Sequence, residues 1–245
     1  MRVVVSLTTI PTREHSLLKT IKSIQSGTVI PDVIYVNIPV KYVRFKEQFD
    51  PDVKKELQSM QGVKVNDVQE EHGALDKIIP VLKLEQDPET CIIIVDDDAS
   101  YSPRFIEGLV TGYSQFQTAV GYSGIAYPET AIRLSGQLRY ILHQGHGQTA
   151  EILEGSFGVL FPRRVFNNFA DVEPMTAENT AMYLSDDYVF SKYLDSQGVN
   201  KRIVWYPWAG RKGDDWSTVV SWNENSQTYS LSSLGNLERY LAVRI

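Results

Sequence analysis

The stretch that most constrains the fold is the apolar run at residues 91–95 (CIIIV), which leads directly into Asp96, Asp97 and Asp98. A short, continuous apolar run rich in β-branched residues is typical of a central strand of a parallel sheet, buried on both faces. Open α/β sheets bind their ligands at the carboxyl ends of such strands. The run therefore predicts an α/β fold with an acidic site where this strand ends.

Three neighbouring carboxylates repel one another, so we expect a cation to share this site. A hard divalent cation such as Mg²⁺ or Mn²⁺ takes oxygen ligands, and one or two carboxylates usually hold it together with substrate phosphates. The alternative is a solvated acidic turn that caps the helix expected after Ser102 and Pro103. The residues alone leave both interpretations open.

Strands and helices alternate around this run. Apolar segments predict strands at residues 3–7, 32–39 and 63–68. Helical spacing and end signals predict helices at residues 15–25, 50–60, 73–84 and 103–116, the third interrupted by Pro80. This alternation predicts a doubly wound, mostly parallel sheet whose fourth strand ends at the aspartates.

The second half of the chain shows a different pattern. Strands are expected at residues 119–127, 154–163 and 202–206, a polar loop at 140–148, a helix within 175–194 and a polar tail at 210–233. No repeat or long linker divides the 245 residues. We therefore expect a single domain with two halves, residues 1–118 and 119–245.

Composition excludes several classes of function. The net charge is −6, and the absence of a Lys/Arg stripe or basic tail argues against nucleic-acid binding. The single cysteine, Cys91, lies in the predicted buried strand and fits a reducing compartment. No segment has the pattern of a signal peptide or of a membrane span of about 20 apolar residues. These features predict a soluble, cytoplasmic protein.

Five segments in order, SLTTIPTR, VIYVNIP, IIIVDDD, EGSFGVLFPR and SDDYVFSKYL, resemble those of nucleotide-sugar glycosyltransferases with the GT-A fold. The resemblance is greatest to the family-2-like branch and to glycosyltransferases encoded by large algal viruses. It implies a Rossmann-like, mixed and mostly parallel sheet flanked by helices. Residues 1–118 would bind the nucleotide sugar, and residues 119–245 would bind the acceptor.

The resemblance implies that the D-x-D pattern within residues 96–98 holds Mn²⁺ or Mg²⁺ against the donor diphosphate. Asp98 would ligate the metal, with Asp96 as a second ligand, and Asp96 or Asp97 would face the ribose or diphosphate. A cation there stabilises charge that develops on the leaving group. His146 is a candidate third ligand, because some GT-A enzymes use a late histidine. Its HQGHG context, with His143, favours a surface loop instead.

Two further groups of residues follow predicted strands where this family binds its nucleotide. After the first strand, Thr8 and Thr9 would bond uracil or ribose, and Arg13 would pair with phosphate. After the third strand, Asp76 would accept a base N–H and Lys77 would offer a point charge to phosphate. The structural alternatives are a helix N-terminus for the first group and an exposed helix face for the second.

Asp186 and Asp187 begin the helix predicted in the second half. Related inverting enzymes carry an acidic pair at this place, and one carboxylate deprotonates the acceptor hydroxyl. The resemblance therefore implies Asp187 as the base and Asp186 as its positioning neighbour. Helix capping by these carboxylates is the alternative.

The expected enzyme is a metal-dependent, inverting glycosyltransferase that moves a sugar from a nucleoside diphosphate, UDP being favoured, to a hydroxyl of a glycan or glycoprotein. A nucleotidyltransferase is one alternative, but it usually has a Gly-rich basic loop after its first strand, and SLTTIPTR has no glycine. A non-catalytic sugar- or nucleotide-binding module is another. Such a module would bind the donor without releasing a nucleoside diphosphate.

Overall fold

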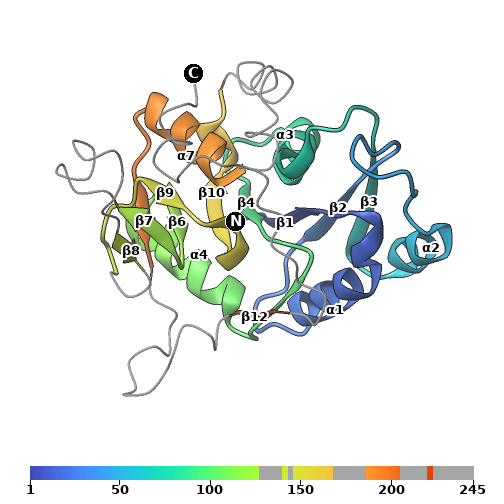
Figure 1. Ribbon diagram of the computed structural model, residues 1–245. Coiled ribbons are helices and arrows are strands. Elements are labelled where there is room, and N and C mark those ends of the chain that lie inside the picture. The colour runs from blue at the N-terminus through green and yellow to red at the C-terminus, as the bar shows by residue number, and fades with distance from the viewer. Residues whose placement is uncertain (127–139, 143–145, 168–185, 205–219, 223–245) are drawn as a thin grey trace.

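The computed structural model describes residues 1–126, 140–142, 146–167, 186–204 and 220–222, with segments 140–142 and 220–222 described by their backbone alone. The elements form three layers, a central sheet between two layers of helices (Figure 1). Among the described helices, none has the length and apolar character needed to cross a bilayer.

The elements along the first half of the chain are β1 (Val3–Thr8), η1 (Pro11–Arg13), α1 (Glu14–Gln25), β2 (Val33–Pro39), α2 (Pro51–Ser59), β3 (Val63–Val68), η2 (Gly73–Lys77), α3 (Ile79–Leu84), β4 (Cys91–Ile94), β5 (Ala99–Tyr101) and α4 (Phe105–Phe116). Those of the second half are β6 (Ala119–Gly121), β7 (Gly124–Ala126), β8 (Tyr140–Leu142), β9 (Ile152–Leu153), η3 (Gly155–Phe157), β10 (Val159–Pro162), η4 (Arg163–Val165), α7 (Asp186–Ser196), β11 (Lys201–Ile203) and β12 (Val220–Trp222).

The central sheet has seven strands in the order β11-β6-β10-β4-β1-β2-β3. Strands β1 to β4 are parallel to one another. Strand β10 is antiparallel to both of its neighbours, β4 and β6, and β11 is parallel to β6. The expected mixed, mostly parallel α/β sheet flanked by helices is confirmed, and both halves of the chain contribute strands to it.

Strand β4 lies in the middle of this sheet and is covered on both faces. Ile92 and Ile94 pack in the core under η2, α3 and α7, whereas Cys91, Ile93 and Val95 pack in the core over α1 and α4. This burial on both faces explains the unbroken apolar run. The residues that follow β4 therefore emerge at the carboxyl edge of the sheet.

Two small sheets accompany the central one. Strands β5 and β12 pair in antiparallel fashion directly after the aspartates. Strands β8, β7 and β9 form a three-stranded antiparallel sheet beside β6.

Three expectations about strands in the second half are wrong. Residues 119–127 contain two strands, β6 and β7, because the chain bends at Tyr122, whose hydroxyl donates a 2.6 Å hydrogen bond to the Phe105 carbonyl. Residues 154–163 contain η3 before β10, because Gly158 has a φ of 84° and a Cβ there would lie 2.2 Å from Phe105 Cζ. Residues 140–142 form β8 where a loop was expected.

Other boundaries shift for simple reasons. Pro80 occupies the first turn of α3, where its missing N–H requires no partner, so it begins this helix and does not interrupt one. The strand expected at 202–206 is β11 within the described residues, and the polar tail supplies a further strand, β12. Residues 143 and 205–206, and residues 175–185 of the predicted helix segment, lie outside the described residues.

Candidate active site

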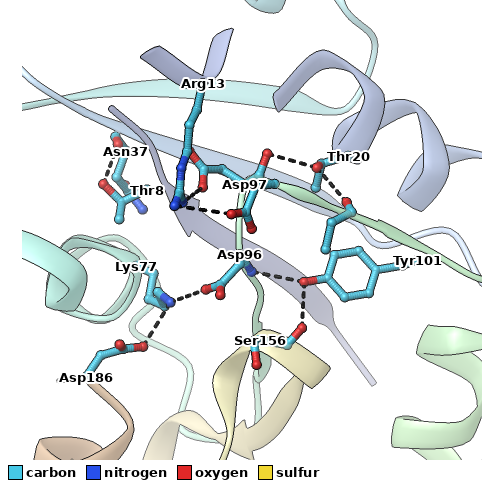
Figure 2. A network of polar contacts seen from close by, with 12 residues as sticks. Thr8, Arg13, Thr20, Asn37, Lys77, Asp96, Asp97, Tyr101, Ser156 and Asp186 are labelled. Atoms are coloured by element: carbon cyan, nitrogen blue, oxygen red, sulfur yellow. Dashed lines mark hydrogen bonds and ion pairs between the residues drawn. The ribbon is translucent and has the colours of Figure 1, made fainter. Parts of the chain in front are cut away.

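The candidate active site lies at the edge of the sheet where β1 and β4 end and β10 begins. Residues 96–98, hereafter the acidic loop, follow β4, and η1 follows β1. From α1, the Thr20 hydroxyl lies 3.0 Å from the carbonyl oxygen of Asp97 and 2.6 Å from that of Ala99 (Figure 2). Helix α1 thus holds the backbone of the acidic loop in place.

Arg13, at the end of η1, spans two of the three aspartates. Its Nη1 lies 2.7 Å from Asp97 Oδ1, and its Nη2 lies 3.2 Å from Asp98 Oδ2. Burial opposes the charge of the guanidinium, but the charges of Asp97 and Asp98 outweigh burial and raise the pKa of Arg13. Arg13 therefore supplies part of the positive charge that the sequence leads one to expect beside the aspartates.

Lys77, at the end of η2, contacts the remaining aspartate of the loop. Its Nζ lies 2.5 Å from Asp96 Oδ1 and 2.9 Å from Asp186 Oδ2 (Figure 2). Burial opposes the ammonium charge, yet Asp186 and Asp96 raise the pKa of Lys77 well above its ordinary value. A single buried ammonium group therefore joins the acidic loop to the first residue of α7.

Asp187, the second residue of α7, faces η3. Its Oδ1 accepts a 2.7 Å hydrogen bond from the backbone N–H of Gly155. Burial and the negative charge of Asp186 raise the pKa of Asp187 well above the usual range of an aspartate, although Lys77 opposes them. A raised pKa suits a carboxylate that accepts a proton near neutral pH.

Asp186 precedes Asp187 in the chain, and its carboxylate pairs with Lys77. Burial raises the pKa of Asp186 as well, and the Lys77 ammonium limits the rise. Because the negative charge of Asp186 raises the pKa of Asp187, these two residues, hereafter the acidic pair, titrate together.

Tyr101, from β5, links the acidic loop to η3. The backbone N–H of Asp96 donates to Tyr101 Oη at 3.0 Å, and the Tyr101 hydroxyl donates to the carbonyl of Ser156 at 3.1 Å (Figure 2). Ser156 follows Gly155, whose backbone N–H donates the hydrogen bond to Asp187. A second set of contacts therefore connects the acidic loop with the acidic pair.

The threonines expected at the nucleotide lie at the same edge of the sheet. The Thr8 hydroxyl donates a 3.0 Å hydrogen bond to the Asn37 carbonyl. Thr9 is buried next to Asp97. Burial raises the pKa of Asp97, and the charge of Arg13 and the Thr9 hydroxyl oppose this rise.

Asp76 lies one residue before Lys77 but makes different contacts. It is fully buried, accepts the backbone N–H of His72 at 3.1 Å, and lies 3.0 Å from His72 Nδ1. Burial raises the pKa of Asp76, and these contacts with His72 lower it. The exposed helix face, offered as the structural alternative for Asp76 and Lys77, is therefore wrong, since both residues are buried.

The structure does not bring His146 to the acidic loop. His146 is exposed, its Nε2 lies 3.1 Å from Gln115 Oε1, and its ring packs 5.3 Å from that of Phe116. Both partners are at the C-terminal end of α4, about 16 Å along the helix axis from its N-terminal end, whereas the acidic loop and β5 come before that N-terminal end in the chain. His146 as a metal ligand therefore has no support in this geometry.

The acidic loop and the acidic pair together hold five carboxyl groups against the two basic groups of Arg13 and Lys77. Burial raises the pKa values of Asp97, Asp186 and Asp187, and the negative charges of neighbouring aspartates add to this rise. Hard carboxylate oxygens with excess negative charge fit Mg²⁺ or Mn²⁺. Asp96, with 27% of its side chain exposed, is the accessible member of the loop.

No group of three His, Cys, Asp or Glu side chains in the described part of the chain is arranged to hold a metal ion. The expectation from the sequence stays that one or two carboxylates, Asp96 and Asp98, would hold the metal together with phosphate oxygens of a donor. This division is the usual one for Mg²⁺ bound with phosphates.

Sequence reasoning missed three participants in this site. Tyr101 gave no signal, since a tyrosine in a short strand is ordinary. Gly155 lies where a Cβ would stand 3.0 Å from Asp187 Oδ1, a contact between distant segments that no local pattern shows. His72 precedes the Gly73 turn and was not considered.

Comparison with known proteins identifies the fold. No family model matches the chain, and a search of curated proteins finds no match. Among solved structures, the mannosyltransferase PcManGT from Pyrobaculum calidifontis, in complex with GDP-Man and Mn²⁺, is similar, with a TM-score of 0.53 and 13% identity. TarS 1–349 from S. aureus, in complex with UDP, is similar with a TM-score of 0.51 and 12% identity.

These similarities cover 82% and 83% of this chain. The chain in turn covers only 54% and 57% of the two neighbours, a little over half of their length. At this level of identity the similarity shows the fold alone. The chain has the GT-A fold expected from its sequence, whereas its relationship to the family-2-like branch or to viral enzymes stays a prediction.

Proposed function

We propose that the protein is a metal-dependent, inverting glycosyltransferase that moves a sugar from a nucleoside diphosphate to an acceptor hydroxyl. The observation that carries this proposal is the meeting of the acidic loop and the acidic pair on one buried lysine, Lys77. Such a transfer needs stabilisation of the leaving diphosphate and a base for the acceptor. The fold shared with structures that contain GDP-Man and Mn²⁺, or UDP, supports the proposal.

On the donor side, Asp96 and Asp98 would hold Mn²⁺ or Mg²⁺. The cation, when bound, supplies positive charge to the departing diphosphate. Arg13 keeps Asp97 and Asp98 in a fixed arrangement through its paired contacts. Thr8, Thr9 and Asp76 border the nucleotide side of the same edge, where their contacts with Asn37, Asp97 and His72 hold them in place.

On the acceptor side, Asp187 is the proposed base. Its carboxylate takes the proton of the acceptor hydroxyl while the acceptor oxygen forms a bond to the anomeric carbon. The bond from that carbon to the diphosphate oxygen breaks, and the nucleoside diphosphate leaves with the electron pair. Attack from the face opposite the leaving group inverts the anomeric centre.

A UDP-sugar is the donor we favour, and a GDP-sugar is the next to test because one structural neighbour holds GDP-Man. The expected acceptor is a hydroxyl of a glycan or glycoprotein.

Nucleoside diphosphate release tests this function. The protein is incubated with UDP-, GDP- and dTDP-sugars, with either Mn²⁺ or EDTA, in the presence of glycan acceptors and in their absence. We expect release from at least one donor, and its loss in EDTA. Release that is indifferent to EDTA contradicts metal dependence. Binding of donors without any release indicates a binding module, and pyrophosphate release from a nucleoside triphosphate and a sugar phosphate indicates a nucleotidyltransferase.

A further inference from the structure

We propose that Lys77 is a positioning residue that ties the proton-accepting pair of α7 to the donor-side acidic loop. This inference rests on the proposed function, and it replaces the expectation that Lys77 binds the donor phosphate. Lys77 would act on catalysis through Asp96 and Asp186, without touching either substrate.

The contacts of Lys77 join three parts of the chain that are distant in sequence. The ammonium group comes from η2, Asp96 follows β4, and Asp186 begins α7. Lys77 itself is only 5% exposed. Carboxylates on two sides already occupy this buried ammonium group, so a donor phosphate would have to displace one of them in order to reach it.

A second path closes the connection into a ring. It runs from the Asp96 N–H through the Tyr101 hydroxyl to the Ser156 carbonyl. From the adjacent Gly155, the backbone N–H reaches Asp187. The acidic loop and the acidic pair are therefore held together twice, once by the charge of Lys77 and once by neutral hydrogen bonds.

Lys77 places one positive charge between two carboxylates. Without it, the partly exposed carboxylate of Asp96 and the buried carboxylate of Asp186 would repel each other, which would move the start of α7 away from the acidic loop. Displacement of a reacting group by about 1 Å lowers rates by about 100-fold. Removal of Lys77 should therefore reduce turnover and leave nucleotide binding nearly intact.

The test compares Lys77→Met with Lys77→Arg, which keeps the charge. Mn²⁺-dependent affinity for UDP and GDP and the turnover number are measured for each variant. We expect Lys77→Met to bind nucleotide within about threefold of wild type and to lose about 100-fold in kcat. We expect Lys77→Arg to recover at least about tenfold of that loss. Nucleotide affinity that falls by about tenfold or more while kcat stays unchanged would overturn the proposal, because it indicates direct phosphate contact.

Lys201→Met is the matched control for loss of a buried lysine. Lys201, in β11, is 1% exposed. It pairs with Asp195, which lies near the C-terminal end of α7, the helix that Asp186 begins. Its removal should lower thermal stability as Lys77→Met does, and should leave kcat within about threefold of wild type. An equal fall in kcat for both variants would mean that Lys77 acts only through general stability.

A thermal-stability cycle separates this inference from the proposed function. Lys77→Met, Asp186→Asn and the double variant are compared by their unfolding temperatures. We expect the double variant to be more stable than Lys77→Met by at least about 3 °C, because it no longer holds an unpaired buried carboxylate. Additive losses would overturn the link between the two residues. A wild-type protein that releases no nucleoside diphosphate overturns the proposed function, but the cycle still decides whether the link exists.

Discussion

The backbone N–H of Gly155 donates a 2.7 Å hydrogen bond to Oδ1 of Asp187. This bond fixes one carboxylate oxygen against η3 and orients the group at the start of α7. Asp186, its neighbour, pairs instead with Lys77. The two aspartates therefore differ in their partners, which supports assigning proton transfer to Asp187 and alignment to Asp186.

Asp187→Asn should abolish transfer and preserve donor binding. The amide has nearly the shape of the carboxylate but does not accept the proton, so kcat should fall by at least about 100-fold. Nucleotide affinity, measured by calorimetry in the presence of Mn²⁺, should stay within about threefold of wild type, since Asp187 belongs to the acceptor side. Asp52→Asn, at an exposed position of α2, is the control and should behave as wild type. Full transfer activity in Asp187→Asn would place the base elsewhere.

The pH profile should carry the signature of the acidic pair. The proposed transfer needs the ionised form of Asp187, and burial and the charge of Asp186 raise the pKa of Asp187. Activity should therefore fall as pH decreases through a midpoint well above the ordinary value for aspartate, about 3.9. Asp186→Asn removes the neighbouring negative charge, which lowers the pKa of Asp187 and moves this midpoint to lower pH. The measurement is kcat/KM as a function of pH, and a midpoint that moves upward in Asp186→Asn would contradict the electrostatic account.

Arg13→Met should make the protein more dependent on an added cation. The substitution leaves Asp97 and Asp98 without the guanidinium that spans them, which should lower the free energy of unfolding by about 2 kcal/mol. Mn²⁺ should raise the unfolding temperature of this variant by more than it raises that of wild type, because the ion restores the missing charge. Arg164→Met removes an exposed pair with Glu89 and should cost no more than about 0.5 kcal/mol. Equal stabilisation of wild type and Arg13→Met by Mn²⁺ would indicate that the ion binds away from these aspartates.

Gly155→Ala should impair activity more than stability. The added Cβ would lie 3.0 Å from Asp187 Oδ1, so the Asp187 carboxylate has to shift by a few tenths of an ångström, whereas its distance of 3.5 Å from Asp186 Oδ2 is an ordinary contact. We expect at least about a tenfold loss of kcat, since small displacements of reacting groups are costly. Gly158→Ala is the contrasting variant, because its φ of 84° and the contact with Phe105 should cost about 2–6 kcal/mol of stability. Thermal unfolding and turnover together check the pair, and unchanged turnover in Gly155→Ala would separate this glycine from the base.

The central strands could be predicted because their information is local. The run that forms β4 is apolar throughout since both of its faces are covered, and its aspartates mark the carboxyl edge of the sheet. The short strands β8 and β12 escaped prediction, because three residues give no periodicity and their partners, β7 and β5, lie elsewhere in the chain. The 3₁₀ turn at η3 was missed because the glycine at 158 accommodates a side chain from α4, Phe105, which no local pattern shows.

The acidic residues of the site were also predictable, since carboxylates that follow a buried strand or begin a helix are visible in the sequence. Their partners were not. The expectation that Arg13 and Lys77 pair with phosphate stays a prediction, and nothing in the sequence indicates their contacts with Asp97, Asp98, Asp96 and Asp186. Which carboxylate a basic residue meets depends on how β1, β4 and α7 pack together. A single sequence does not carry that information in any local pattern.

The pairing of β5 with β12 has a consequence for the synthesis of the protein. Residues 99–101 lie directly after the acidic loop, and their partner strand consists of residues 220–222. Because the chain grows from its N-terminus, β1 to β4 are translated long before this partner strand. The edge of β5 is left open through that interval. The segment that completes the surroundings of the aspartates is thus translated after every described strand of the central sheet, so the site would be finished only after the strands that carry it have been made.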